Sequence, residues 1–390
     1  MFSRRTDWKL TPNRFTQAQR EVSTAGREVL DLTVSNPFRA GLHYDPEAIL
    51  NSLRNPKAMD YDPQPKGLYS AREAVALYYR EQHGEFLDPD SLLLTTSTSE
   101  GYSYIFRLLC NPDDEVLVPK PSYPLFEFLA DLQDVKLAPY PLLYDHGWQI
   151  DFPSLARAVT SRTRAVVVVH PNNPTGSYVS AGERTQLNAF CREHGLALIV
   201  DEVFLDYPHD GAPRPSFVLN PDVLTFTLSG LSKISGLPQM KLAWVAASGP
   251  APAFTAAMDR LEVVADTYLS MNAPIQLAAV VLLEQRKNIQ PLLLDRLRIN
   301  LSELDRQLAQ QKAVQRLQVE GGWYALLRVP AIQSDEDLAI ALLHQASVLV
   351  HPGHFYDFPS DGYLIVSLLT PPTEFREGAS RILELLNHRQ

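Results

Sequence analysis

The chain has 390 residues, of which 45% are hydrophobic, so it can bury a large core and form two domains or one domain with a smaller satellite. The formal net charge is -10, which argues against a nucleic-acid-binding surface and against a polybasic membrane-binding segment. The chain starts with polar residues, and its cysteines Cys110 and Cys191 have no paired spacing. No apolar run approaches the roughly 20 residues of a membrane span. These features predict a soluble cytoplasmic protein that acts on small molecules.

Short apolar runs alternate with amphipathic stretches through the first two thirds of the chain. The amphipathic stretches at 100–110 and 181–195 have helical spacing, and the second ends in a glycine that suits a helix C-terminus. This alternation predicts a mostly parallel sheet with helices on both faces. The predicted strands lie at 91–96, 115–119, 136–140, 165–170, 197–202, 223–229 and 241–247.

The pattern changes after about residue 285. A long helical segment is predicted at about 288–315, followed by the strand-like "GGWYALLRVP", a helix near 335–346, the strand-like "YLIVSLL" and a final helix from about 373. We therefore expect a large domain at 46–289 and a smaller α+β domain formed by 1–45 together with 290–390.

Polar segments follow four of the predicted strands. "TSTSE" follows "LLLT", "PNNPTG" follows "VVVVH", Asp201 ends "ALIVD", and Lys233 lies just past "TFTLS". Ligands of open parallel sheets bind outside the carboxyl ends of the strands, so these segments are expected to meet in one crevice.

The residue types in these segments predict one cofactor. The turn "STSEGY" at 97–102 offers N–H groups, hydroxyls and a helix N-terminus to a phosphate, and Lys233 can form an imine with an aldehyde. Asp201 can keep a ring nitrogen protonated, and Tyr123 can stack on a flat ring. Phosphate, aldehyde, ring nitrogen and aromatic ring together describe pyridoxal 5'-phosphate.

"HPNNPTG", "DEVFLDY" and "SGLSKISGLPQMKLAW", in this order and spacing, resemble the class I/II aminotransferases among the fold-type I pyridoxal phosphate enzymes, which are aspartate aminotransferase-like. The resemblance extends from "DLTVSNPF" and "YDPQPKGLYSAREA" to "HPGHFYDF". It implies a large domain with a mainly parallel seven-stranded sheet, a smaller discontinuous α+β domain, and a homodimer with its sites at the subunit interface. It also implies ping-pong transfer of an amino group from a donor, expected to be an amino acid, to a keto acceptor.

The resemblance assigns the central roles to three residues. Lys233 would form the Schiff base and, once freed, move the proton, Asp201 would pair with the ring nitrogen, and Asn173 would hydrogen-bond the phenolic oxygen. The simpler interpretations are a solvated lysine at a strand end, a capping aspartate, and an asparagine that only forms a turn.

The resemblance also assigns contacts to the cofactor's phosphate. Thr98, Ser99 and Ser232 would hold the phosphate, and Tyr61 would reach it from the second subunit. Serine and threonine at helix starts are commonly plain caps, which is the alternative for these contacts.

Three positions depart from the family pattern. Lys241 stands eight residues after Lys233 where the family usually has an arginine, so a point charge replaces a two-pronged donor. Phe204 replaces a tyrosine that donates to the phenolic oxygen, and its lack of a hydroxyl should favour the protonated Schiff base. Ile365 replaces the arginine that binds the substrate carboxylate.

The loss of that arginine leaves the substrate open. Ser35 lies in a segment that passes over the substrate in the family, and the nearby Arg39 is the nearest candidate to bind a carboxylate. The alternatives are that Arg39 is solvated surface and that the donor is an amine without a carboxylate.

Two other activities are consistent with parts of the pattern. A lyase or decarboxylase would use the same cofactor, because substrate orientation decides which bond at Cα breaks. A cofactor-sensing module without turnover would be expected to follow a DNA-binding domain, and the roughly 30 residues before "DLTVSNPF" are too few for one. We expect no metal site.

Overall fold

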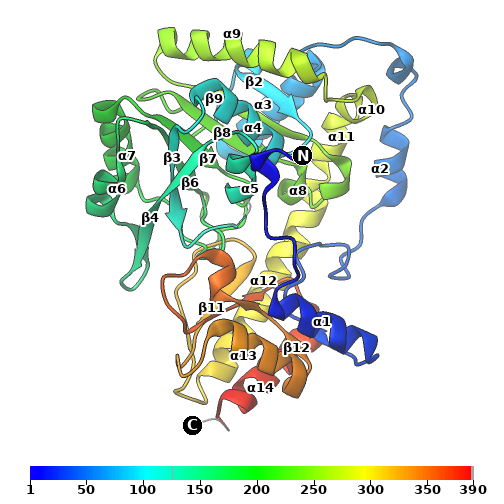
Figure 1. Ribbon diagram of the computed structural model, residues 1–390. Helices are drawn as coiled ribbons and strands as arrows, with labels where there is room; N and C mark the ends of the chain where they lie inside the picture. Colours follow the sequence, from blue (N-terminus) through cyan, green and yellow to red (C-terminus); the bar gives the residue numbers. More distant parts are fainter. Residues whose placement is uncertain (125, 388–390) are drawn as a thin grey trace.

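A computed structural model of the chain describes residues 1–124 and 126–387 (Figure 1). Its largest sheet has eight strands in the order β2-β9-β8-β7-β6-β3-β4-β5, and the neighbours from β8 to β4 all pair in parallel. The predicted strands are confirmed, and β5 adds a short edge that forms a hairpin with β4. The strands are β2 (Leu92–Thr95), β3 (Glu115–Lys120), β4 (Lys136–Tyr144), β5 (Trp148–Ile150), β6 (Thr163–Val169), β7 (Ala197–Asp201), β8 (Thr225–Gly230) and β9 (Ala243–Ser248).

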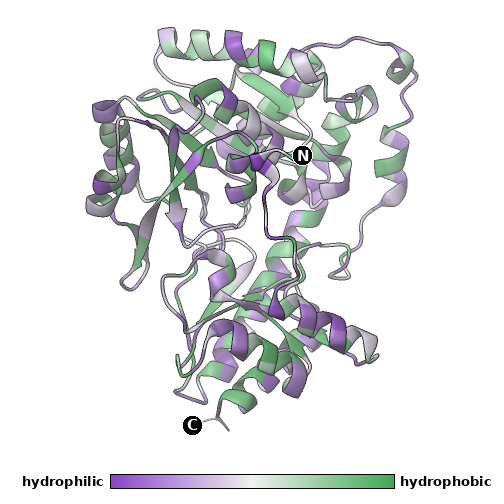
Figure 2. Ribbon diagram, viewed as in Figure 1, coloured by the Kyte–Doolittle hydropathy of each residue, from purple (hydrophilic) through white to green (hydrophobic). Residues whose placement is uncertain are grey.

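Helices cover both faces of this sheet, and the strand sequences explain why. Successive side chains of a strand point to opposite faces, so the apolar run at the end of β6 buries Val167 in one apolar cluster and Val166 and Val168 in the other. Figure 2 shows the strands of this sheet as largely hydrophobic. The first cluster includes side chains of α4 (Thr98–Leu109), α5 (Phe126–Asp131) and α9 (Ala251–Tyr268), and the second includes those of α6 (Phe152–Ala158) and α7 (Ala181–His194).

A third apolar cluster lies where β2 and β9 end the sheet. It joins their side chains to α3 (Tyr69–His83), α10 (Ala273–Leu277) and α11 (Ala279–Glu284). Short elements complete this part of the chain: α2 (Pro46–Ser52), η2 (Pro56–Met59), η3 (Pro89–Ser91), α8 (Leu231–Ile234) and η4 (Pro238–Met240).

Helix α7 has a cap at each end, and the glycine at its C-terminus acts as predicted. Ser180 and Glu183 form a reciprocal capping box at its N-terminus, which satisfies backbone N–H groups of the first turn. Gly195 closes the C-terminus with a φ of 64°, a left-handed conformation that glycine adopts without strain.

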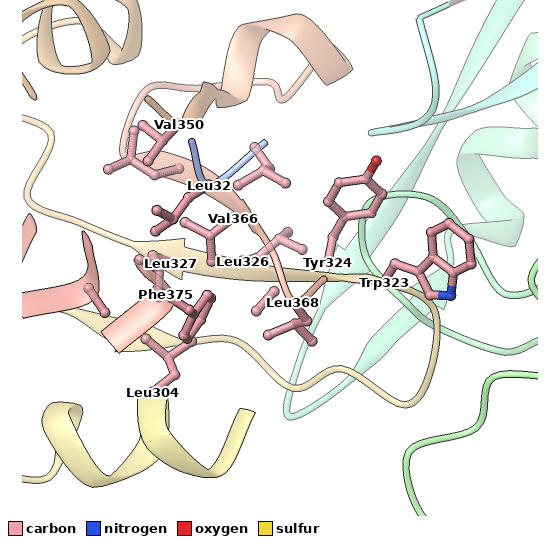
Figure 3. Close-up of a cluster of buried hydrophobic side chains, with 14 of the residues drawn as sticks. Leu32, Leu304, Trp323, Tyr324, Leu326, Leu327, Val350, Val366, Leu368 and Phe375 are labelled. Carbon is pink, nitrogen blue, oxygen red and sulfur yellow. The ribbon is translucent and has the colours of Figure 1, made fainter. Parts of the chain in front are cut away.

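The C-terminal part of the chain forms a second, smaller layered unit around its own core (Figure 3). Helix α12 (Arg286–Leu308) runs from the larger part into it and is shorter than the predicted 288–315 segment. The antiparallel sheet β10-β11-β14-β13 consists of β10 (Gln315–Arg316), β11 (Tyr324–Arg328), β14 (Tyr363–Ser367) and β13 (His351–Pro352).

The N-terminal region joins this smaller unit. Strand β1 (Leu30–Asp31) pairs in parallel with β12 (Val348–Leu349), so residues at opposite ends of the chain lie side by side. The remaining elements are η1 (Arg4–Thr6), α1 (Arg14–Thr24), α13 (Asp335–Ala341), the π-helical turn η5 (Leu342–Ala346), η6 (Gly353–Tyr356) and α14 (Pro372–Asn387). No helix among the described residues is long and apolar enough to cross a membrane.

The turn after β6 connects the two parts at Gly176. The N–H groups of Glu320 and Gly321 donate to the Gly176 carbonyl oxygen at 3.2 and 3.0 Å. Gly176 has a φ of +69°, and a Cβ there would overlap the Gly321 carbonyl oxygen and the side chain of Val319. Glycine is therefore required by both the backbone conformation and the close approach of the two segments.

Gly176→Ala is expected to lower the free energy of unfolding by about 2 kcal/mol or more, because it combines a positive φ with a clash against backbone. Urea denaturation measures the change. Gly182→Ala in α7 is the matched control: its added Cβ meets nothing within 4 Å, so its stability should be unchanged or slightly higher. Equal stability of Gly176→Ala and wild type would contradict the assigned constraint.

Candidate functional site

A cavity of about 310 Å³ lies at the carboxyl ends of β6, β7 and β8 and extends to β11 of the smaller sheet. Its size suits a small ligand, and its position is the one expected for ligands of open parallel sheets. It is lined by Ser35, Ser97, Thr98, Ser99, Tyr102, Tyr123, Phe126, Leu129, Val169, Asn173, Asp201, Val203, Phe204, Gly230, Ser232, Lys233, Pro238, Ala243 and Tyr324.

Lys233 is positioned by the short helix α8, which directly follows β8. Its Nζ lies 4.5 Å from the ring centroid of Trp323 and 5.2 Å from that of Phe204. Burial lowers the pKa of the amine to about 8, and the nearby charge of Asp201 partly opposes this shift. Tyr207 Oη donates to the Lys233 carbonyl oxygen at 2.5 Å. The backbone is thereby fixed, and the amine is more nucleophilic near neutral pH than an ordinary lysine.

Asp201 is the last residue of β7 and lies deep in the cavity. Burial raises the pKa of its carboxyl to about 6, while the N–H of Val203 and the hydroxyl of Tyr102 lower it by hydrogen bonding. Tyr102 Oη donates to Asp201 Oδ2 at 3.2 Å. This buried carboxylate suits a cationic or N–H donor group of a ligand.

The N-terminus of α4 presents hydroxyls and backbone N–H groups to the cavity. Ser97 is the N-cap, and its side chain accepts the N–H of Glu100 at 3.2 Å. Thr98 and Ser99 begin the helix, and Ser232 of α8 lines the same cavity. Helix N-termini attract anions, so this end of the cavity suits a phosphate.

The turn after β6 brings Asn173 into the cavity. Its Oδ1 is buried and has no hydrogen-bond partner among the described residues, so the amide is available to a ligand. Tyr123 lies on the same lining with 45% of its surface exposed, which leaves its ring accessible for stacking.

The structure thus brings together most of the residues predicted from the sequence. Eight of them line the one cavity: Ser35, Thr98, Ser99, Tyr123, Asn173, Asp201, Ser232 and Lys233.

Tyr61, Lys241 and Arg39 do not line it. Tyr61 is 83% exposed beside a separate groove that also includes 269–274. Lys241 is exposed with a φ of 52°, and Arg39 is exposed.

Two of the three positions that depart from the family pattern, Phe204 and Ile365, are apolar and buried. Phe204 packs edge-on against Trp323 with ring centroids 5.2 Å apart. Ile365 is 0% exposed in the core of the smaller unit, where it pairs with Leu326 and His351. No residue of β14 is a cation.

Four residues near the cavity were not singled out from the sequence: Ser97, Tyr102, Trp323 and Tyr324. Ser97 and Tyr102 lie within "STSEGY", and the sequence carries a signal for each. A serine just before a helix is typical of an N-cap, and Tyr102 lies one helical turn after Thr98. Tyr324 begins β11 and Trp323 directly precedes it, far from Lys233 in sequence, so no local pattern predicts the contact of Trp323 with Lys233.

Comparison with known proteins identifies similar chains over nearly the full length. A sequence model described as Aminotransferase class I and II matches residues 27–382. Glutamate-pyruvate aminotransferase AlaA of Haemophilus influenzae is 28% identical over 370 residues, 93% of this chain and 91% of the relative. Alanine aminotransferase of Mycobacterium bovis is 31% identical over 350 residues, 87% of this chain and 81% of the relative.

Solved structures show the same fold. An aminotransferase from Escherichia coli has a TM-score of 0.86 and 26% identity, with 99% of this chain and 98% of that chain covered. An alanine aminotransferase from Pyrococcus furiosus has a TM-score of 0.89 at 23% identity, with 100% of both chains covered, which is a likeness of fold.

Stability should depend on pH through Lys233 in the ligand-free protein. Between its pKa of about 8 in the folded protein and the ordinary value of 10.5, the unfolded chain holds a proton that the folded protein lacks. The free energy of unfolding contributed by this residue therefore rises with pH across that window. Lys233→Met should remove the rise, a difference of up to about 3 kcal/mol.

Denaturant unfolding of both proteins from about pH 7 to about pH 11 measures this difference. Below about pH 8 the lysine is protonated in both states, so the two curves should run parallel there. Curves that stay parallel over the full range would contradict a lowered pKa at Lys233.

Proposed function

This chain belongs to the class I and II aminotransferase family, and on that premise we propose that its cavity binds pyridoxal 5'-phosphate and that Lys233 holds it covalently. The protein is a fold-type I, pyridoxal phosphate-dependent aminotransferase, which transfers an amino group from an amino donor to a keto acceptor. We propose that the transfer follows a ping-pong course.

The residues present fit this cofactor, and one observation carries the proposal. Lys233 and Asp201 line the same cavity, and burial moves both of their pKa values toward neutrality, the lysine down to about 8 and the carboxyl up to about 6. Such opposed shifts are typical of catalytic groups. Asn173 lines the same cavity, and its amide Nδ2 can donate a hydrogen bond to the phenolic oxygen.

When bound, the cofactor supplies an aldehyde for attachment and an electron sink for chemistry at the substrate's Cα. Asp201 would hold the proton on the ring nitrogen, and Asn173 and Tyr123 would orient the ring. The freed amine of Lys233 would take the proton from the substrate's Cα and deliver it to the cofactor. Burial lowers the pKa of Lys233 to about 8, so at that pH a larger fraction of the amine is neutral, as a base requires, than for an ordinary lysine.

We propose that the phosphate lies at the N-terminus of α4, held by Thr98, Ser99 and Ser232. We propose that the ammonium group of Lys241 helps to neutralise the charge of this phosphate. The Leu231 N–H donates to the Leu242 carbonyl oxygen at 2.9 Å, which brings the residue after Lys241 beside the start of α8.

The proposal includes a homodimer in which Tyr61 reaches the phosphate of the other copy. The support is exposure: Tyr61 and Met59 are 83% and 89% exposed beside one groove, which is unusual for large apolar side chains unless a partner covers them.

We further propose a large domain at 46–289, a small domain of 1–45 and 290–390, and a cytoplasmic location, which suits the free thiols of Cys110 and Cys191.

The lyase and decarboxylase alternative is not favoured, because the similar proteins that cover most of this chain are named aminotransferases. Alanine and glutamate are the donors we propose to test first, on the names of those relatives.

A carboxylate on the donor needs a positively charged side chain to bind it. Among the described residues that line the cavity, Lys233 is the one cation. We propose that Arg39, four residues after the cavity-lining Ser35, binds this carboxylate when the donor is bound.

Borohydride reduction of the yellow protein should fix the cofactor on Lys233, as identified by mass spectrometry of peptides. Lys233→Ala should keep its circular dichroism spectrum but lose turnover by several orders of magnitude, because both the attachment point and the proton carrier are gone. Label found on a different lysine would show that the site is assigned wrongly.

Arg39→Ala is expected to reduce kcat/KM for alanine or glutamate by about 10²-fold, the loss expected for one charge-assisted pair. The absorbance of the bound cofactor should stay unchanged. Arg20→Ala, an exposed arginine of α1, is the matched control and should leave kcat/KM unchanged. If amino acids do not react with the wild type while amines without a carboxylate do, Arg39 has no such role.

A further inference from the structure

A buried polar network centres on Asp206, whose side chain is 0% exposed. His83 Nε2 lies 3.0 Å from Asp206 Oδ1, and Tyr78 Oη donates to both carboxylate oxygens at 3.1 Å. Gln290 Nε2 donates to Oδ2 at 2.7 Å. None of these residues lines the cavity described above. Burying a carboxylate is costly unless it is fully hydrogen-bonded, and here donors from α3 and α12 surround it.

The network ends on the backbone that carries Lys233. Gln290 Nε2 also donates to the carbonyl oxygen of Ile234 at 2.9 Å. Tyr207, the neighbour of Asp206 in sequence, donates to the carbonyl oxygen of Lys233 itself at 2.5 Å. The last carbonyls of a helix lack partners within it, and α8 ends at Ile234. Side chains therefore hold two consecutive carbonyls at the reactive lysine.

Gln290 is the link between the charge and the lysine segment. One amide nitrogen with two hydrogens serves Asp206 and Ile234 together, so the orientation of the amide depends on the carboxylate. Asp206 in turn depends on His83 and Tyr78, which approach it from the end of α3. A network that only joined helices would not need to terminate on the peptide groups of Lys233 and Ile234.

We propose that His83, Asp206 and Gln290 form a positioning relay that holds Lys233 in place while its amine leaves the cofactor and carries the proton. This inference rests on the proposed role of Lys233. The amine must stay within reach of the reacting atoms after its covalent attachment is broken, and the fixed backbone of α8 limits how far it can move.

Charged groups around His83 make the relay sensitive to pH. Burial lowers the pKa of the imidazole, but the hydrogen bond and charge of Asp206, with smaller effects of Glu202 and Glu85, raise it above 6.5 overall. The attraction between the imidazolium and the Asp206 carboxylate is thus present at pH values below the raised pKa and is lost as the pH rises through it.

The other groups near the His83 ring come from several elements. Tyr78 and Tyr79 of α3 pack against it, and the guanidinium of Arg286 in α12 lies 5.5 Å from the Tyr78 ring centroid. His170, at the end of β6, is also close enough to interact electrostatically, and burial lowers its pKa to about 3. His170 is therefore uncharged in the pH range where His83 titrates.

Gln290→Met removes both donors while keeping the size of the side chain. In the holoenzyme it is expected to lower kcat by about 10-fold to 10²-fold, with less than about a threefold change in KM, because substrate binding does not involve the relay. In cofactor-free protein, attachment of added pyridoxal 5'-phosphate, followed by absorbance, should slow by about 10-fold.

Gln307→Met is the matched control. Gln307 is another buried glutamine of α12, and its Nε2 likewise donates to a carboxylate, Glu303, and to a backbone carbonyl, that of Arg376, both at 2.9 Å. It lies away from Lys233, so its replacement should lower thermal stability without changing kcat. If Gln290→Met has no larger effect on kcat and on attachment than Gln307→Met, the relay is purely structural and the proposal is wrong.

Asp206→Asn provides a second test if Gln290→Met fails to fold. It should lower the His83 pKa, followed by NMR of the ring, and reduce kcat by about 10-fold while the cofactor still attaches to Lys233. An unchanged kcat together with a lowered His83 pKa would overturn the relay. Failure of attachment in the wild type would instead refute the role of Lys233, so the two outcomes are distinguishable.

Discussion

Lys233 and Asp201 lie in one cavity where both charged groups are shielded from water. A lysine amine and a carboxylate are both costly to remove from water, and their pKa values move to about 8 and about 6 as a consequence. The parallel sheet makes this burial possible, because β7 and β8 deliver the two residues at neighbouring strand ends. Helices on both faces and the smaller unit then exclude solvent around them.

The surroundings of Lys233 are aromatic on one side and hydrogen-bonded on the other. Trp323 and Phe204 lie within 4.5 and 5.2 Å of the amine, whereas Tyr207 and Gln290 hold the carbonyls of the lysine and its neighbour. Aromatic faces attract the ammonium form without supplying a proton acceptor. The amine is thus left free for a ligand, while its backbone is fixed.

Two of the departures from the family pattern, Phe204 and Ile365, place an apolar side chain where the family has a polar or charged one. Phe204 keeps the ring of a tyrosine without its hydroxyl and packs on Trp323, and Ile365, with 0% exposure in the core, stands in place of a charged side chain. Neither side chain has a polar group that could contact a cofactor or substrate. Because β14 carries no cation, we propose that recognition of a charged donor falls to the N-terminal segment around Ser35, which lines the cavity.

Features that depend on residues close together in the chain could be predicted from the sequence. The period of apolar side chains predicted the main strands of the large sheet and the helices α4, α7, α12, α13 and α14. The glycine at 195 predicted a helix end, and the motifs placed Asn173, Asp201 and Lys233 at strand ends. Parallel strands gather their carboxyl ends at one edge, so the convergence of these residues also followed from the pattern.

Only the tertiary structure decided which distant side chains meet. Tyr102 reaches Asp201 across 99 residues, Gln290 reaches Ile234 across 56, and Trp323 packs over Lys233 from the smaller unit. Such contacts depend on how helices and strands pack and on how deeply each group is buried. The spacing of apolar residues along the chain predicts neither the packing nor the burial. The pKa values follow from that burial, so the sequence identified the reactive groups while the fold decided their chemistry.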